Sequence, residues 1–424
     1  MTKTRSSGHP LRLAVAAAAA VATAAVGLAA PARAQDKEPI TFALLQDFTG
    51  VYTFVSNEYN QGQQDYIKLI NAQGGVNGHP IELIVRDTGN EPQRGIEAYN
   101  RAVEEGTVLV DFLSTPVSRA MVPRVLDDEV TMITALHGRG DASAGKTFPY
   151  VFPMMATYWS QASVLANYME EEMGGLEGKK IAHVFIDSPF GREPLPILRE
   201  LAERKGFEVK AFPYPSPGNE QSSTWSDVRR WGPDYVTIWG AGGGQPVSIR
   251  TAIRNGISPE QILSVVWLAR TDMKQVGFDA ATGVKRFEAV HTGRDTPVIQ
   301  DILKQVVEPG NGTGDKANVG TTYYNIGVAT MAASVQAAQH ALDEHGAPLT
   351  GSKLKQGFEM LRDFNARGLM PPITITAEDH QGGGYGRVSM WNGEEWEPQT
   401  DWVSAYQDIV WQEIKDNAKE FEGN

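Results

Sequence analysis

Cysteine is absent from the whole chain of 424 residues. The protein therefore has no disulfide bonds, and no cysteine follows its N-terminal apolar run to carry a lipid. Two signatures of common hydrolases, Gly-x-Ser-x-Gly and His-Glu-x-x-His, are also missing. His340 and His345 are five residues apart, so they do not share one face of a helix and do not indicate a zinc site. We therefore expect no enzyme, no cofactor and no metal.

An excess of positive charge is lacking too, because 51 Asp and Glu residues outnumber 38 Lys and Arg residues and the net charge is −13. An acidic chain of this kind argues against nucleic acid and anionic lipid as partners. After residue 34, no apolar run is long enough to span a membrane.

The first 34 residues differ from the rest of the chain. Basic residues precede or open an alanine-rich apolar run from Leu13 to Ala30, and Ala32-Arg33-Ala34 follows it. This order is typical of a secretory signal that is cleaved before Gln35. Loss of its four basic residues would change the net charge from −13 to −17 and leave about 390 residues, enough for two domains. A membrane anchor is the alternative interpretation of this run.

Strand-like and helix-like segments alternate from residue 40 to about residue 270. A glycine-rich turn at Gln73–Pro80 separates the first helix-like segment from the next strand. Strands are expected at Ile40–Leu45, Ile81–Asp87, Val108–Leu113, Thr131–Thr134, Lys180–Ile186 and Tyr235–Trp239. Helices are expected at Val117–Asp127, Glu193–Arg204, Val247–Arg254 and Gly320–Leu342. Repeated strand–helix units predict the α/β class, with parallel sheets flanked by helices.

Two breaks interrupt this alternation, one near Tyr150–Pro153 and one between Phe287 and Asp301. After Pro371-Pro372, short strands are expected at Ile373–Thr376 and Arg387–Trp391.

Several short segments, in this order, resemble the solute-binding proteins of the leucine–isoleucine–valine type that serve ABC transporters. They are Asp47-Phe-Thr-Gly50, Ile70-Asn-Ala-Gln-Gly-Gly-Val-Asn-Gly78, Ser114-Thr-Pro116, Tyr150-Val-Phe152, Asp187-Ser-Pro-Phe-Gly191 and Gly232-Pro-Asp-Tyr-Val236. The resemblance implies two Rossmann-like lobes, each a parallel sheet, joined by a three-strand hinge with a ligand held between them. It places residues 38–155 and 289–370 in the first lobe, and residues 156–288 and 371–424 in the second.

The same resemblance implies a monomeric periplasmic protein that delivers a small molecule to a permease and its ATPase in the inner membrane. Binding would favour the closed state of the two lobes. A sensor subunit that presents its ligand to a membrane receptor would have the same fold and site, and it remains an alternative.

Two strand-to-helix turns of the first lobe are candidates for binding a ligand carboxylate. Ser114 and Thr115 precede a helix, with Thr115 the expected N-cap, and free backbone N–H groups there suit an anion. In the family this turn binds a carboxylate. Leu136 and His137 occupy the next turn, where relatives have small or hydroxyl residues. The imidazole of His137 either donates to a ligand oxygen or caps the local backbone.

The second lobe adds Phe190, where the family usually has Tyr, and the glycine-rich turn that contains Ala241 and Gly242. A dinucleotide fingerprint is incomplete there, because Gln245 replaces its third glycine. Aromatic residues are frequent near the expected cleft: Tyr52, Phe54, Tyr158, Trp159, Phe190 and Trp267.

The segment Val265–Asp272 departs from amino-acid binders, which have an acid here that pairs with the ligand's amino group. This chain has Trp267 and Arg270 instead, and Asp272 lies further along. Arg270 would suit a carboxylate if it faces the cleft, and otherwise it is a surface residue. We therefore expect an aromatic or apolar organic acid as ligand, with a branched-chain amino acid or an amide such as urea as alternatives.

Overall fold

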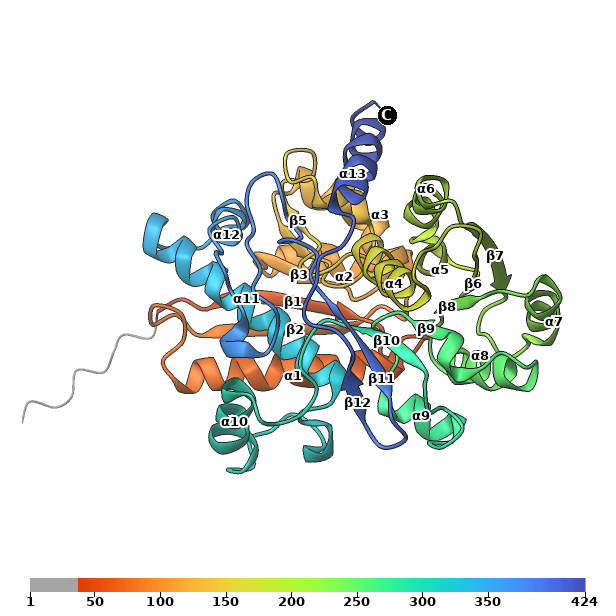
Figure 1. The fold of residues 1–424 in the computed structure, drawn as a ribbon. Helices are drawn as coiled ribbons and strands as arrows, with labels where there is room; N and C mark the ends of the chain where they lie inside the picture. Colours follow the sequence, from red (N-terminus) through yellow and green to blue (C-terminus); the bar gives the residue numbers. More distant parts are fainter. Residues whose placement is uncertain (1–36, 424) are drawn as a thin grey trace, which may run out of the picture. The chain divides into compact units, whose positions relative to one another are not determined.

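A computed structural model describes residues 37–423, and the expected signal peptide lies outside them. These residues form two sheets with helices packed against them (Figure 1). The first sheet has the order β2-β1-β3-β4-β5 and is parallel throughout. Its strands are β1 (Ile40–Gln46), β2 (Ile81–Asp87), β3 (Leu109–Asp111), β4 (Thr131–Ile133) and β5 (Val151–Phe152).

The second sheet has the order β12-β11-β10-β9-β8-β6-β7. Its strands are β6 (Lys180–Ile186), β7 (Glu208–Tyr214), β8 (Tyr235–Trp239), β9 (Ile262–Ser264), β10 (Lys285–Glu288), β11 (Arg387–Trp391) and β12 (Trp396–Pro398). Strands β6 to β10 run parallel, whereas β11 pairs antiparallel with both β10 and β12. The expected α/β class is confirmed, and the second sheet is mixed rather than parallel because the chain returns to it through the hairpin β11–β12.

Thirteen α-helices accompany the sheets in the described part of the chain. They are α1 (Thr53–Ala72), α2 (Pro92–Glu104), α3 (Thr115–Asp127), α4 (Tyr158–Met173), α5 (Pro189–Arg192), α6 (Leu195–Lys205), α7 (Ser222–Trp231), α8 (Gly244–Arg254), α9 (Arg270–Val276), α10 (Pro297–Ile302), α11 (Thr322–His345), α12 (Gly351–Phe358) and α13 (Gln407–Glu422). None of the described helices is long and apolar enough to cross a membrane.

The chain passes between the two sheets three times: after β5, after β10, and before β11. After the second passage, α11 packs along α1 and α12 packs against β4, so both helices belong with the first sheet (Figure 1). We call this sheet with its helices α1 to α3 and α10 to α12 the first lobe. The second sheet with α4 to α9 is the second lobe.

Close packing of α1 on α11 depends on two glycines. A Cβ atom on Gly62 would lie 2.2 Å from the carbonyl oxygen of Tyr324, and one on Gly327 would lie 2.1 Å from that of Tyr59. Each helix therefore presents bare backbone to the other. Helix α11 is buried on almost all sides, which explains its alanine-rich sequence.

One expectation about local structure needs correction. Ile373–Thr376 is not a strand, because Ile373 forms only an isolated bridge with Phe364 and the neighbouring backbone continues as a loop. The C-terminal helix contacts elements of both lobes. Helix α13 packs on α4 and α6, but its ring of Phe421 also lies 4.6 Å from the ring of Phe148 in the first lobe.

Candidate functional site

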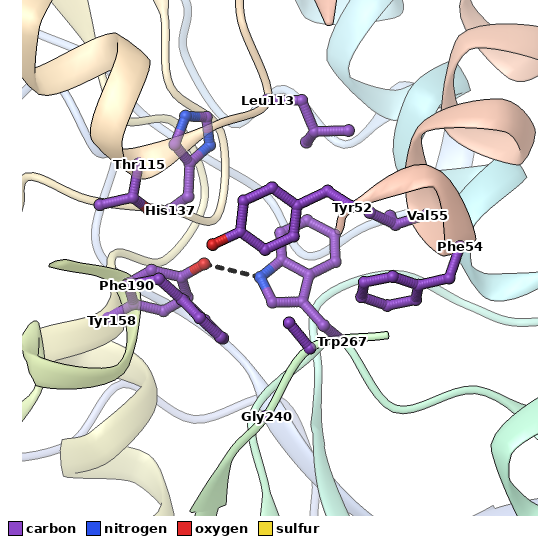
Figure 2. A pocket seen from close by; sticks show the side chains of 11 residues that line it. Tyr52, Phe54, Val55, Leu113, Thr115, His137, Tyr158, Phe190, Gly240 and Trp267 are labelled. Atoms are coloured by element: carbon purple, nitrogen blue, oxygen red, sulfur yellow. Dashed lines mark hydrogen bonds between the residues drawn. The ribbon is translucent and has the colours of Figure 1, made fainter. Parts of the chain in front are cut away.

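A small cavity lies where the carboxyl ends of strands from both lobes meet (Figure 2). Its volume is about 20 Å³, close to that of one water molecule. Its lining comprises Tyr52, Phe54, Val55, Leu113, Thr115, His137, Tyr158, Phe190, Gly240, Ala241 and Trp267. None of these residues carries a charge at neutral pH. His137 would become positive only if its imidazole were protonated. Aromatic rings from both lobes fill most of the space.

Seven of the residues expected at the site from sequence line this cavity together: Tyr52, Thr115, His137, Tyr158, Phe190, Ala241 and Trp267. Four others, Ser114, Leu136, Gly242 and Arg270, do not line it. The structure adds Val55, Leu113 and Gly240, which carry no polar side chain that would have marked them. Trp159 lies outside the cavity and donates its indole N–H to the carbonyl oxygen of Glu193.

At the start of α3, the N-cap is Ser114 rather than Thr115. The backbone of Ser114 is extended, and its hydroxyl accepts from the N–H of Val117 at 3.3 Å. Thr115 is therefore the first helical residue, and its side chain lines the cavity. Since Pro116 has no N–H group, Thr115 supplies the donors of this turn.

His137 caps local structure and is neutral. Its Nδ1 lies 3.0 Å from the carbonyl oxygen of Ala135, so Nδ1 carries the proton and Nε2 accepts from the hydroxyl of Ser118 at 3.1 Å. Burial lowers the pKa of His137 to about 4. Because both ring nitrogens have partners within the first lobe, the ring forms a fixed wall of the cavity.

Neutral hydrogen-bonding groups meet at one end of the cavity. The indole N–H of Trp267 donates to the hydroxyl of Tyr158 at 2.7 Å, and Thr115 lines the same cavity. In Figure 2 the hydroxyl groups of Tyr52 and Tyr158 point toward one another. Burial raises the pKa of both tyrosines, so both hydroxyls keep their protons and can donate.

The apolar part of the cavity joins the two lobes directly. The ring of Tyr52 from the first lobe meets the ring of Phe190 from the second edge-on, with centroids 6.1 Å apart. Gly242 does not face the cavity, but a Cβ atom there would lie 3.0 Å from the carbonyl oxygen of Val51. This turn of the second lobe therefore touches the backbone of the first.

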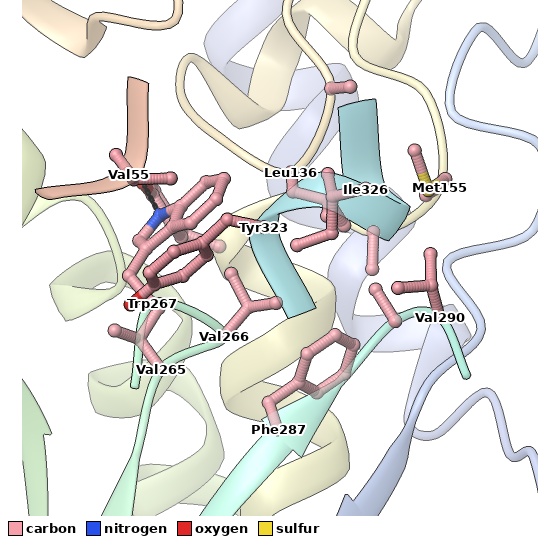
Figure 3. Packing of buried hydrophobic residues seen from close by; sticks show 14 of the residues in the cluster. Val55, Leu136, Met155, Val265, Val266, Trp267, Phe287, Val290, Tyr323 and Ile326 are labelled. Carbon is pink, nitrogen blue, oxygen red and sulfur yellow. Dashed lines mark hydrogen bonds between the residues drawn. The ribbon is translucent and has the colours of Figure 1, made fainter. Parts of the chain in front are cut away.

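Leu136 is part of the core. It is fully buried in the cluster that contains Ile326, and Figure 3 shows the two side chains close together. Its carbonyl oxygen accepts from the side-chain amide of Gln161 at 3.1 Å. The turn at 136–137 thus contributes the imidazole ring to the cavity and directs the leucine away from it.

Arg270 lies beside a different cavity. Its Nε donates to the carbonyl oxygen of Glu394 at 3.2 Å, and its guanidinium lies 4.7 Å from the ring centre of Phe278. The second cavity has a volume of about 410 Å³ and is also bordered by Glu58 and Arg294. The structure therefore does not bring Arg270 together with Thr115.

The acids nearest the aromatic cavity have partners elsewhere. Asp47 accepts from the backbone N–H of Tyr52, and Asp272 accepts from that of Ala269, both within 2.9 Å. Burial raises the pKa of Asp272 to about 7. Glu193 accepts from Arg119 and from a backbone N–H. No carboxylate among the described residues lines the cavity, so it offers no anionic partner for an ammonium group.

Residues 140–147, GDASAGKT, match the Gly-x4-Gly-Lys-Thr pattern of phosphate-binding loops. That chemistry requires the loop to open a helix, whereas here the two-residue strand β5 follows. Lys146 pairs with Glu378, and Thr147 donates to Glu422. The pattern is therefore not a nucleotide site. Within residues 37–423, no group of His, Asp and Glu side chains is arranged to hold a metal ion.

Comparisons with known proteins agree with this geometry. A family model described as periplasmic binding protein matches residues 39–395. A solved structure from the Pseudomonas fluorescens group, described as an ABC transporter permease, is 32% identical, covers 91% of this chain and 97% of its own, and has a TM-score of 0.83. A fatty acid ABC transporter substrate-binding protein from Thermomonospora curvata is 20% identical, covers 88% of this chain and 94% of its own, and has a TM-score of 0.73.

Among curated proteins, Leu/Ile/Val-binding protein homolog 3 from Brucella melitensis is 24% identical over 43% of this chain and 49% of its own length. The matched segments span 49% to 66% of the lengths of the three curated relatives. All three are named as binding proteins, in agreement with the expectation from sequence. The family match covers most of the chain, so the protein belongs to the periplasmic binding protein family.

Proposed function

We propose that this protein is the ligand-binding component of an ABC importer and captures an apolar or aromatic carboxylate between its two lobes. The proposal rests on one observation above all. Five aromatic side chains and no charged group surround the cavity, while neutral donors converge at one end of it. Such a site suits a ligand with an apolar body and one group that accepts hydrogen bonds.

The carboxylate would lie against Thr115, Tyr52 and Tyr158. Neutral hydroxyl donors and the positive end of the α3 dipole stabilise an anion without requiring a buried cation. The apolar body would lie among the rings of Phe54, Phe190 and Trp267. Because the cavity now holds about 20 Å³, these rings must move apart on binding, which parting of the lobes would permit.

A branched-chain amino acid is the second candidate, because the curated relatives are named for leucine, isoleucine and valine. Its ammonium group would need a partner inside the cavity. An unpaired buried ammonium is costly, and the nearby Asp47, Asp272 and Glu193 have other partners. The organic acid is therefore the favoured ligand. The delivery of ligand to a permease and its ATPase by a monomer remains part of the proposal.

Thermal unfolding against a panel of aliphatic acids, aromatic acids, amides and amino acids tests the ligand class. A ligand at 100 times its dissociation constant stabilises the folded protein by about 2.7 kcal/mol, which raises the melting temperature by a few degrees. We expect a rise with the acids. A rise with amino acids alone would contradict the proposal.

Thr115→Val then tests the site, because valine keeps the shape of threonine and removes its hydroxyl. We expect the affinity for the acid found in the panel to fall about tenfold or more, since hydrogen bonds to charged groups contribute about 1.5–3 kcal/mol. Arg270→Ala is the matched control and should leave the affinity unchanged. Loss of binding in Arg270→Ala with none in Thr115→Val would move the site to the second cavity.

A further inference from the structure

Glu193 connects the two lobes beside the aromatic cavity. It follows α5, the second-lobe helix that carries Phe190, and its side chain is 5% exposed. Its carboxylate accepts from Nη1 of Arg119 at 3.0 Å and from the backbone N–H of Gly140 at 2.8 Å. Both donors belong to the first lobe, and Arg119 lies one turn after Thr115 on α3. One side chain thus links the helices that carry the two halves of the cavity.

The segment that receives Glu193 fits it because two glycines leave room. A Cβ atom on Gly138 would lie 2.7 Å from the carboxyl carbon of Glu193, and one on Gly140 would lie 2.5 Å from the ring of Trp159. Real Cβ atoms do not approach other atoms so closely. Trp159 also donates to the carbonyl oxygen of Glu193 at 2.8 Å, which fixes the backbone on the second-lobe side.

The ion pair of Glu193 with Arg119 places a carboxylate in a buried position. Burial raises the pKa of Glu193, while Arg119 and the N–H of Gly140 oppose that rise, and Asp141 and Arg139 add smaller opposite effects. The carboxylate is 5% exposed and the Arg119 side chain 42% exposed, so a loss of this cation is unfavourable mainly for the buried carboxylate, which parted lobes would return to water. Arg119 therefore contributes to contact between the lobes at this point, together with the N–H of Gly140.

We propose that Glu193 is a positioning residue that holds α5 against α3 and gives the protein a closed population even before ligand binds. This link needs no contribution from a ligand, because Arg119 and the N–H of Gly140 bond the carboxylate of Glu193 directly. The role of this closed population in ligand capture rests on the proposed function. The closure itself does not.

The absence of cysteine permits a direct measurement of closure. Glu82→Cys in β2 and Arg229→Cys in α7 place one label on each lobe at exposed positions. Single-molecule energy transfer between the labels, without any ligand, gives the ratio of closed to open molecules. This ratio is measured in the labelled parent, in the Arg119→Ala variant, in the Glu193→Gln variant and in the double variant.

We expect two populations in the parent and at least a tenfold lower closed-to-open ratio in Arg119→Ala, which removes the cation and leaves the carboxylate only its bond from the N–H of Gly140. Adding Glu193→Gln should restore part of the ratio, a rescue that a merely structural role of Arg119 would not produce. Gly138→Ala should lower the ratio sterically without changing any charge. Arg124→Ala, an exposed arginine on the same helix, is the control and should have no effect.

Three results would each overturn the proposal. They are a single open population in the parent, an unchanged ratio in Arg119→Ala, and a double variant no more closed than Arg119→Ala. Thermal unfolding of each variant confirms that the chain is folded. Since no ligand is used, failure here leaves the proposed ligand untouched, and failure of the ligand panel leaves this result untouched.

Discussion

Tyr158→Phe probes the polar end of the cavity with the smallest possible change. The substitution removes one oxygen atom, which accepts from the indole N–H of Trp267 at 2.7 Å inside the protein. Trp267 is 5% exposed, so its indole N–H stays buried after the substitution. An unsatisfied buried donor costs about 1–3 kcal/mol, and we expect the free energy of unfolding to fall by about 2 kcal/mol.

Urea unfolding followed by circular dichroism measures this change. With a denaturant slope of about 3 kcal/mol/M, the midpoint should fall by about 0.7 M and the slope should stay constant. The affinity for the acid should fall as well, because the same hydroxyl faces the cavity.

A second background separates the hydrogen bond from other effects of losing the hydroxyl. In Trp267→Phe the donor is already gone, so Tyr158→Phe should then cost about 1 kcal/mol less, because removal of both partners is nearly neutral. Equal costs in the two backgrounds would refute the assigned hydrogen bond.

Two further changes test other parts of the structure. Burial raises the pKa of Asp272 from 3.8 to about 7, so the ionised carboxylate opposes folding. Asp272→Asn should therefore stabilise the protein relative to the parent. The gain in the free energy of unfolding should grow between pH 4 and pH 7 and reach the order of 4 kcal/mol. Urea unfolding at pH 4, 5.5 and 8 measures this, and a difference that shrinks as pH rises would contradict it. Gly327→Ala should cost more than 3 kcal/mol in the same assay, since its methyl group would lie 2.1 Å from the backbone oxygen of Tyr59. Gly243→Ala, which meets nothing within 4 Å, should cost little, and a comparable loss in both would refute the packing argument.

Strands that are buried on both faces were predictable from sequence. Ile40–Gln46 and Lys180–Ile186 read as continuous apolar runs because helices cover both sides of their sheets. Glu208–Tyr214 is an edge strand with an alternating pattern of burial, and Ile262–Ser264 is only three residues long. The first carries little apolar signal, whereas the second opens the apolar run Ile262–Ala269, most of which lies outside the strand.

The candidate site was predictable to the level of strand ends, because ligands of open α/β sheets bind there. That rule places Thr115, Phe190 and Ala241 without any side-chain geometry. It does not say which of two adjacent residues faces inward, and so Ser114 was not distinguished from Thr115. Arg270 could not be placed either, because its direction depends on a contact with the hairpin β11–β12, which is more than one hundred residues away in sequence.

The most direct test of the central claim compares 4-methylpentanoate with leucine by titration calorimetry. The two compounds differ only by the ammonium group. A cavity without an acid should bind 4-methylpentanoate at least one hundred times more tightly, because an unpaired buried ammonium costs several kcal/mol. Tighter binding of leucine would contradict the account and would mean that an acid enters the cavity when ligand binds.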